Sequence, residues 1–108
     1  MSLKGTLSVG SSCRITIDSA VATPGTLAVA LLWIPNPAGT TPAPDVFAVA
    51  PGGKIQRSLV VPSAQMLLVD LDLPSVQGGG ATIVVEQGAV VVAEGVEGAD
   101  ATWTFLVV

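Results

Sequence analysis

Asp70 and Asp72 are the first residues of this chain whose type and spacing could support chemistry. They flank Leu71, so in an extended strand both carboxylates lie on one face, about 6.6 Å apart along the strand. Oxygen ligands of this kind suit a hard cation such as Ca²⁺ or Mg²⁺. The same pattern is also the polar face of an alternating strand, where most carboxylates only meet water or a nearby Arg. We favour this second interpretation.

A second acidic group contains Glu94, Glu97 and Asp100, interleaved with Gly95 and Gly98. Glycine allows a backbone to wrap around an ion, so these carboxylates are a further candidate for binding Ca²⁺. Their spacing does not match the calcium loop of an EF-hand. We therefore expect a solvated acidic loop over residues 94–100.

The chain contains no histidine, which excludes Ser-His-Asp and Cys-His catalysis and most zinc and copper sites. Its single cysteine, Cys13, lies on the apolar side of an alternating segment, with Arg14 on the other side, so we expect a buried, unpaired and unreactive thiol. The glycines at 78–80 lack the Lys and Ser or Thr of a phosphate-binding loop. The sequence therefore predicts no catalytic, cofactor-binding or metal-binding residue, and a protein that is not an enzyme.

Charged residues are scarce, with four Lys or Arg and eight Asp or Glu among 108 residues. The cations are scattered along the chain, at Lys4, Arg14, Lys54 and Arg57. Because phosphate backbones require several cations on one surface, we expect no binding of nucleic acid. The longest apolar run covers residues 27–34, whereas a transmembrane helix needs about 20 residues. The first residues show no signal-peptide pattern, and the localisation is left open.

Apolar and polar residues alternate with a period of two over Cys13–Asp18, Val69–Leu73 and Thr102–Val107. Gly-rich and Pro-rich turns separate such segments at intervals of about 8–12 residues. The sequence predicts one domain, residues 1–108, with an all-β fold. We expect an antiparallel β-sandwich of immunoglobulin-like or jelly-roll-like type with eight or nine short strands.

The inward faces of these segments predict the core. We expect these residues to be buried: Cys13, Ile15, Ile17, Leu31, Leu59, Val69, Leu71, Trp103 and Phe105. Strict alternation places Arg57 on the same side as Ile55 and Leu59, so either a bulge intervenes or Arg57 points inward and is paired. Gln87-Gly88 is predicted to be the turn of a hairpin. The four prolines of residues 35–44 predict an irregular segment there.

Residues 27–34, 90–92 and 105–108 are apolar on both faces, although a two-layer sandwich gives each strand only one core face. The outward side chains therefore predict an interaction surface made of Leu32, Trp33, Ile34, Val91, Leu106 and Val108. Trp33 belongs either to this surface or to the core. The sequence predicts a non-enzymatic structural or protein-interaction module that self-associates, most simply as a dimer, with another protein as a further partner. The alternative is a sandwich that binds carbohydrate or Ca²⁺.

Overall fold

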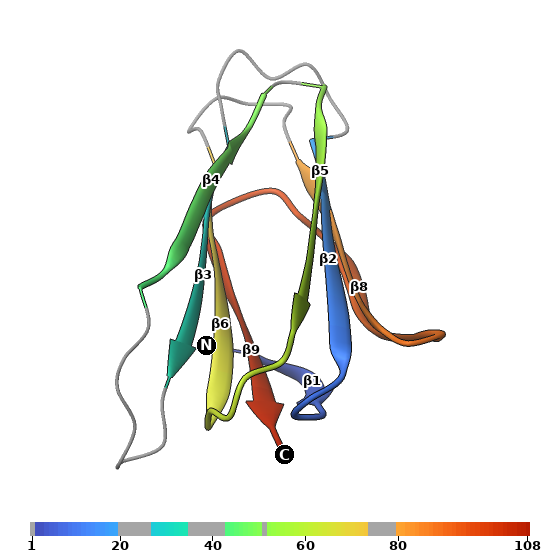
Figure 1. Ribbon diagram of the computed structural model, residues 1–108. Helices are drawn as coiled ribbons and strands as arrows, with labels where there is room; N and C mark the ends of the chain where they lie inside the picture. Colours follow the sequence, from blue (N-terminus) through green and yellow to red (C-terminus); the bar gives the residue numbers. More distant parts are fainter. Residues whose placement is uncertain (1, 20–26, 35–42, 51, 74–79) are drawn as a thin grey trace.

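The computed structural model describes residues 2–19, 27–34, 43–50, 52–73 and 80–108. Within them the chain forms nine strands and no helix, in two packed sheets (Figure 1). The prediction of an all-β sandwich with eight or nine strands is confirmed. The strands are β1 (Ser2–Leu7), β2 (Ser12–Asp18), β3 (Leu27–Ile34), β4 (Asp45–Val49), β5 (Lys54–Val60), β6 (Met66–Asp72), β7 (Ala81–Gln87), β8 (Val90–Glu97) and β9 (Ala101–Val107).

Sheet A has five strands in the order β1-β9-β6-β3-β4, and sheet B has four in the order β5-β2-β7-β8. The strand pairs are antiparallel except β1 and β9, which are parallel. The parallel β1–β9 pair is an exception within a sandwich that is otherwise antiparallel, as the sequence predicts. It arises because β1 and β2 form no hairpin: β1 belongs to sheet A, whereas β2 lies in sheet B.

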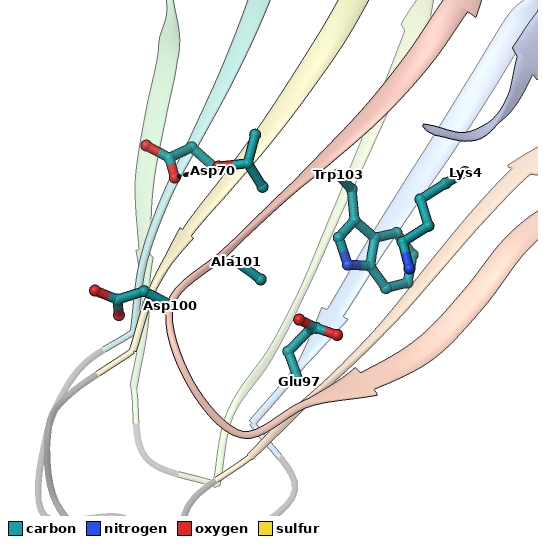
Figure 2. Close-up of a pocket in the computed structure, with 7 residues that line it drawn as sticks. Lys4, Asp70, Glu97, Asp100, Ala101 and Trp103 are labelled. Carbon is teal, nitrogen blue, oxygen red and sulfur yellow. Dashed lines mark hydrogen bonds between the residues drawn. The ribbon is translucent and has the colours of Figure 1, made fainter. Parts of the chain in front are cut away.

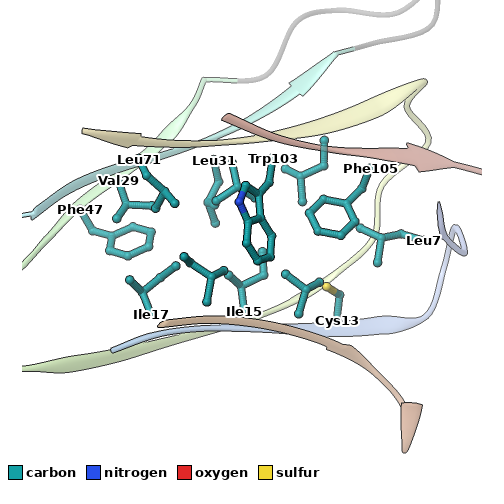
Figure 3. Packing of buried hydrophobic residues seen from close by; sticks show 14 of the residues in the cluster. Leu7, Cys13, Ile15, Ile17, Val29, Leu31, Phe47, Leu71, Trp103 and Phe105 are labelled. Atoms are coloured by element: carbon teal, nitrogen blue, oxygen red, sulfur yellow. The ribbon is translucent and has the colours of Figure 1, made fainter. Parts of the chain in front are cut away.

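The core lies between the two sheets and is filled by the inward side of each strand. Figure 3 shows Trp103, Phe105 and Leu31 of sheet A facing Ile15 and Cys13 of sheet B. The predicted core residues are buried, with one exception. Leu59 is only partly buried because its strand, β5, is an edge strand of sheet B.

Two predicted boundaries are wrong. The turn between β7 and β8 is Gly88-Ala89, not Gln87-Gly88, because Gln87 pairs with Val90 as the last rung of the ladder. Gly88 has a φ of 63°, a conformation in which glycine avoids the clash of a side chain. The expected acidic loop is shorter than predicted, since β8 continues through Glu97 and pairs with β7 from Val90 to Glu97, with one register shift between Val85 and Glu86.

For the segment around Arg57, the sequence predicts either a bulge or an inward-pointing, paired Arg57, and the structure shows the second. The β2–β5 ladder is regular, with Ile15 opposite Arg57, so no bulge turns the side chain outward. Arg57 lies on the inward side and is paired with Asp45 of sheet A. The irregular segment predicted over residues 35–44 and the glycines at 78–80 lie largely outside the described residues, so the structure does not test them.

Candidate functional site

A continuous apolar surface lies on the outer side of sheet A. We call it the apolar face and define it by five residues: Leu32, Ile34, Met66, Leu68 and Leu106. The strand register brings them together, because Met66 is paired with Ile34 on one side and with Leu106 on the other. Leu68 is paired with Leu32 in the same way. Three neighbouring strands, β3, β6 and β9, therefore present large apolar side chains side by side.

The apolar face follows from the alternation of each strand. Leu31, Leu67 and Phe105 enter the core, so their neighbours in sequence must point away from it. Leu106 is 40% exposed, and the other four are partly exposed because they shield one another. Thr104, between Leu3 and Leu68 on the same side, is buried, and its hydroxyl has no hydrogen-bond partner within the described part of the chain.

The charges on this side of sheet A are confined to one end. In the described residues of β3, β6 and β9, the charged side chains that point outward are Asp70 and Asp72, and both are exposed. Asp70 follows Leu68 by one step of the alternation, so the acidic end adjoins the apolar face directly. The outer surface of sheet A thus has an apolar part and an acidic part.

The residues predicted as an interaction surface do not all share one location. Leu32, Ile34 and Leu106 belong to the apolar face, and Val108 is exposed immediately beyond the end of β9. Val91 instead pairs with Glu86 on the outer side of sheet B, on the opposite surface of the sandwich. Trp33 is only 9% exposed and belongs to the core, so its assignment to a surface is corrected. Its odd position in β3 places it beside Leu31, facing inward.

Met66 and Leu68 were missed by the sequence analysis. The signal was present, because Met66-Leu67-Leu68 is a short run that is apolar on both faces. The strand register alone shows that this run lies between β3 and β9 and joins their outward residues into one surface.

A pocket of about 380 Å³ lies where β9 begins (Figure 2). Its walls come from β1, β6, β8, β9 and the turn before β9, and they are formed by Lys4, Asp70, Glu97, Asp100, Ala101, Thr102 and Trp103. The ammonium group of Lys4 lies 4.8 Å from the centre of the Trp103 ring. On β8, the glycine at position 95 leaves room for this ring: a Cβ there would be 3.3 Å from two of its carbon atoms.

Hydrogen bonds hold two of the carboxylates of this pocket in place. The hydroxyl of Thr102 donates to Asp70 Oδ1 at 3.2 Å, and the backbone N–H of Leu73 donates to Asp100 Oδ1 at 2.9 Å. Three of the five acidic residues that the sequence analysis considered therefore line one pocket, namely Asp70, Glu97 and Asp100. In the described part of the chain, no group of three Asp, Glu or Cys side chains is arranged to hold a metal ion.

Cys13 lies deep in the core, with 1% of its surface exposed. Burial disfavours the charged thiolate and raises the pKa of Cys13 to about 11. The thiol is therefore poorly suited to nucleophilic chemistry near neutral pH.

Comparison with known proteins identifies no relative. No protein-family model matches the chain, and neither does any curated protein. No solved structure matches it either. Among the described residues, no helix is long and apolar enough to cross a membrane.

Proposed function

We propose that this chain is a non-enzymatic β-sandwich module that self-associates as a two-fold dimer through the apolar face. The observation that supports this function is the continuity of five large apolar side chains across β3, β6 and β9. No charged side chain of these strands lies among them, since Asp70 and Asp72 are at one end. Large uninterrupted apolar surfaces on soluble proteins commonly contact a partner.

The outer side of sheet A is large enough for a second copy of the chain to be this partner. Sheet A has five strands, which at about 4.8 Å per strand gives a width of about 24 Å. Strand β3 has eight residues, or about 26 Å at 3.3 Å per residue. The whole outer side of sheet A, with the acidic end included, is thus at most about 600 Å² per copy, or about 1,200 Å² for two copies. This reaches the lower end of specific protein interfaces.

The distribution of charge suits a two-fold arrangement. A face-to-face pair in which the strands of the two copies run in opposite directions places the apolar faces against each other. The acidic end with Asp70 and Asp72 then extends toward the edge of the interface in each copy. Both carboxylates stay hydrated there, and the like charges of the two copies remain apart.

The experiment introduces one lysine on the outer side of either sheet and compares the masses of the two variants in solution. Light scattering after size exclusion, at micromolar concentration, should give a mass near twice 10.8 kDa for the wild type. Leu106→Lys should give the monomer mass and still unfold cooperatively in urea, at a lower midpoint because the stabilisation by dimerisation is lost. Val60→Lys is the matched control, since Val60 is 62% exposed on the outer side of sheet B. A monomeric wild type, or equal dissociation by both variants, contradicts the proposal.

The alternative function is a sandwich that binds carbohydrate or Ca²⁺ through Trp33 and the acidic residues. The positions of these residues give it less support than the apolar face gives self-association. The ring of Trp33 is in the core and offers no surface to a sugar. Of the carboxylates, Asp72 and Glu94 do not line the pocket at the start of β9. A different protein could bind the same apolar face. A monomeric wild type would favour such a partner over a second copy of the chain.

The finer classification of the fold is part of this proposal. The order β9-β6-β3-β4, with β2 beside β5 in the opposite sheet, follows strands G, F, C and C′ and strands B and E of an immunoglobulin-like sandwich. The β7–β8 hairpin, between β6 and β9 in sequence, is then an addition that lies next to β2. This order favours an immunoglobulin-like over a jelly-roll-like arrangement.

A further inference from the structure

The pocket at the start of β9 contains a buried donor without an acceptor. Trp103 is 2% exposed, and within the described part of the chain its Nε1–H has no hydrogen-bond partner. Figure 2 shows the carboxylate of Glu97 below the indole, on the side of the ring nitrogen, and the ammonium of Lys4 beside the ring. Buried indole N–H groups are usually paired. A ligand oxygen that accepts from Nε1 would satisfy this one.

The other groups of the pocket present both donors and acceptors. Lys4 makes its contact with the indole ring and forms no ion pair with any described residue. The carboxylate of Glu97 likewise accepts no hydrogen bond from the described part of the chain. Asp70 and Asp100 each accept a hydrogen bond at Oδ1, so Oδ2 of each can accept a hydrogen bond from a ligand. A ligand that fits must therefore accept from Trp103 and Lys4 and also donate to carboxylates.

These requirements exclude three simple classes of ligand. An anion would meet three carboxylates and only one cation, so it would be repelled. A metal ion would need a closer set of ligands than the described carboxylates provide. A cationic amine could bind the carboxylates, but it would leave Trp103 Nε1–H without an acceptor and would lie near Lys4.

We infer that the pocket binds a small neutral polyhydroxylated ligand, such as one unit of a saccharide. A hydroxyl group both accepts and donates, so neighbouring hydroxyls can accept from Trp103 and Lys4 and donate to Glu97. The volume of about 380 Å³ is within the range of sites for one small molecule. Recognition uses the edge of the indole rather than its face, because the ring is buried between Lys4 and β8.

The direct test is an NMR titration of the two indole N–H signals, one for each Trp. The probes are glucose, galactose, mannose, N-acetylglucosamine, maltose, cellobiose and lactose, each raised into the millimolar range. At least one should shift the Trp103 signal saturably and leave the Trp33 signal in place. Trp103→Phe assigns the signal. The site overlaps only the acidic end of sheet A, so Leu106→Lys should bind the same probe whether or not the wild type is a dimer.

Two matched variants show whether the pocket is responsible. Glu97→Gln should raise the Kd about tenfold, as expected when a hydrogen bond to a charged group is weakened. Glu94→Gln is the control, because Glu94 pairs with Val84 on the outer side of sheet B and does not line the pocket. The inference is overturned if no probe gives a saturable shift of the Trp103 signal, if both variants weaken binding equally, or if CaCl₂ alone produces the shift.

Discussion

Arg57 of β5 and Asp45 of β4 form an ion pair that joins the two sheets at their open edge. The distance between Arg57 Nε and Asp45 Oδ2 is 3.2 Å, and the guanidinium group also lies 4.3 Å from the centre of the Phe47 ring. Strand β5 belongs to sheet B and β4 to sheet A, so the pair connects strands that share no backbone ladder. A charged residue at an inward position of β5 is thus explained by its partners on the facing sheet.

We expect Arg57→Ala to lower the free energy of unfolding by about 1 kcal/mol. The ion pair is partly exposed and contributes at most about 1 kcal/mol, and stacking on Phe47 adds about 0.5–1 kcal/mol before losses. Arg14→Ala is the control, because Arg14 pairs with Glu86 on the outer side of one sheet. Urea denaturation of both variants decides this, and equal effects would show that the contact between sheets adds nothing.

Leu71→Ala should cost about 2–5 kcal/mol, as is usual when a fully buried Leu is truncated. Leu71 is 0% exposed and packs in the core between the sheets. Val46→Ala, at a side chain 65% exposed in the same sheet, should change stability by less than about 0.5 kcal/mol. Thermal or urea unfolding measures both. A small effect of Leu71→Ala would mean that the assignment of inner and outer faces in β6 is wrong.

Gly5→Ala should destabilise the fold by about 1–3 kcal/mol through overpacking. A Cβ at this position would lie 2.6 Å from Cγ1 of Val92, and the β-branched Val side chain has little freedom to move away. The contact lies where β1 of sheet A meets β8 of sheet B. Adding Val92→Ala should recover part of the loss, measured against Val92→Ala alone. A double variant as unstable as the sum of the two single ones would contradict the steric explanation.

Cys13 should make stability fall as the pH rises from about 9 to about 11. Burial raises the pKa of the folded thiol from 9.0 to about 11, so in this window the unfolded chain loses the proton and the folded chain keeps it. Unfolding is then favoured by up to about 3 kcal/mol at the upper end. Below pH 9 both states keep the proton and the contribution is constant.

Cys13→Ala should lack this part of the pH dependence, and the difference between the two urea midpoints across the window is the measurement. A thiol reagent such as DTNB should label native wild type at pH 8 only slowly, because labelling requires opening of the core. Parallel pH profiles of the wild type and Cys13→Ala, or rapid labelling, would show that the thiol is accessible.

The core could largely be predicted from the sequence, because period-two alternation is a local property of a strand. Ile15 and Ile17, or Leu71, enter the core whichever strands lie beside them. The burial of Leu59 was overestimated, since the sequence does not show that β5 is an edge strand. The turn at Gly88-Ala89 was misplaced by one residue, because the register between Gln87 and Val90 depends on the full ladder.

The apolar face and the pocket at the start of β9 depend on contacts between distant segments of the chain. Only some of their residues could therefore be predicted from the sequence. Leu106 and Ile34 could be predicted from the sequence as outward apolar residues. Met66 lies between them only because β6 is placed between β9 and β3 in sheet A, and this strand order could not be predicted. Glu97 was noted as acidic, whereas its position below Trp103 requires β8 and β9 to meet at the start of β9.

The strands, most of the core and the scarcity of charge can be predicted from the amino-acid sequence, because they follow from the chemistry of neighbouring residues. Which outward side chains form one surface depends on the arrangement of the strands in the folded chain. The same arrangement also decides that β1 pairs in parallel with β9, that Trp33 is buried, and that Arg57 has Asp45 as partner. Strand order and sheet packing are set by long-range contacts, which a local alternation of polar and apolar residues does not specify.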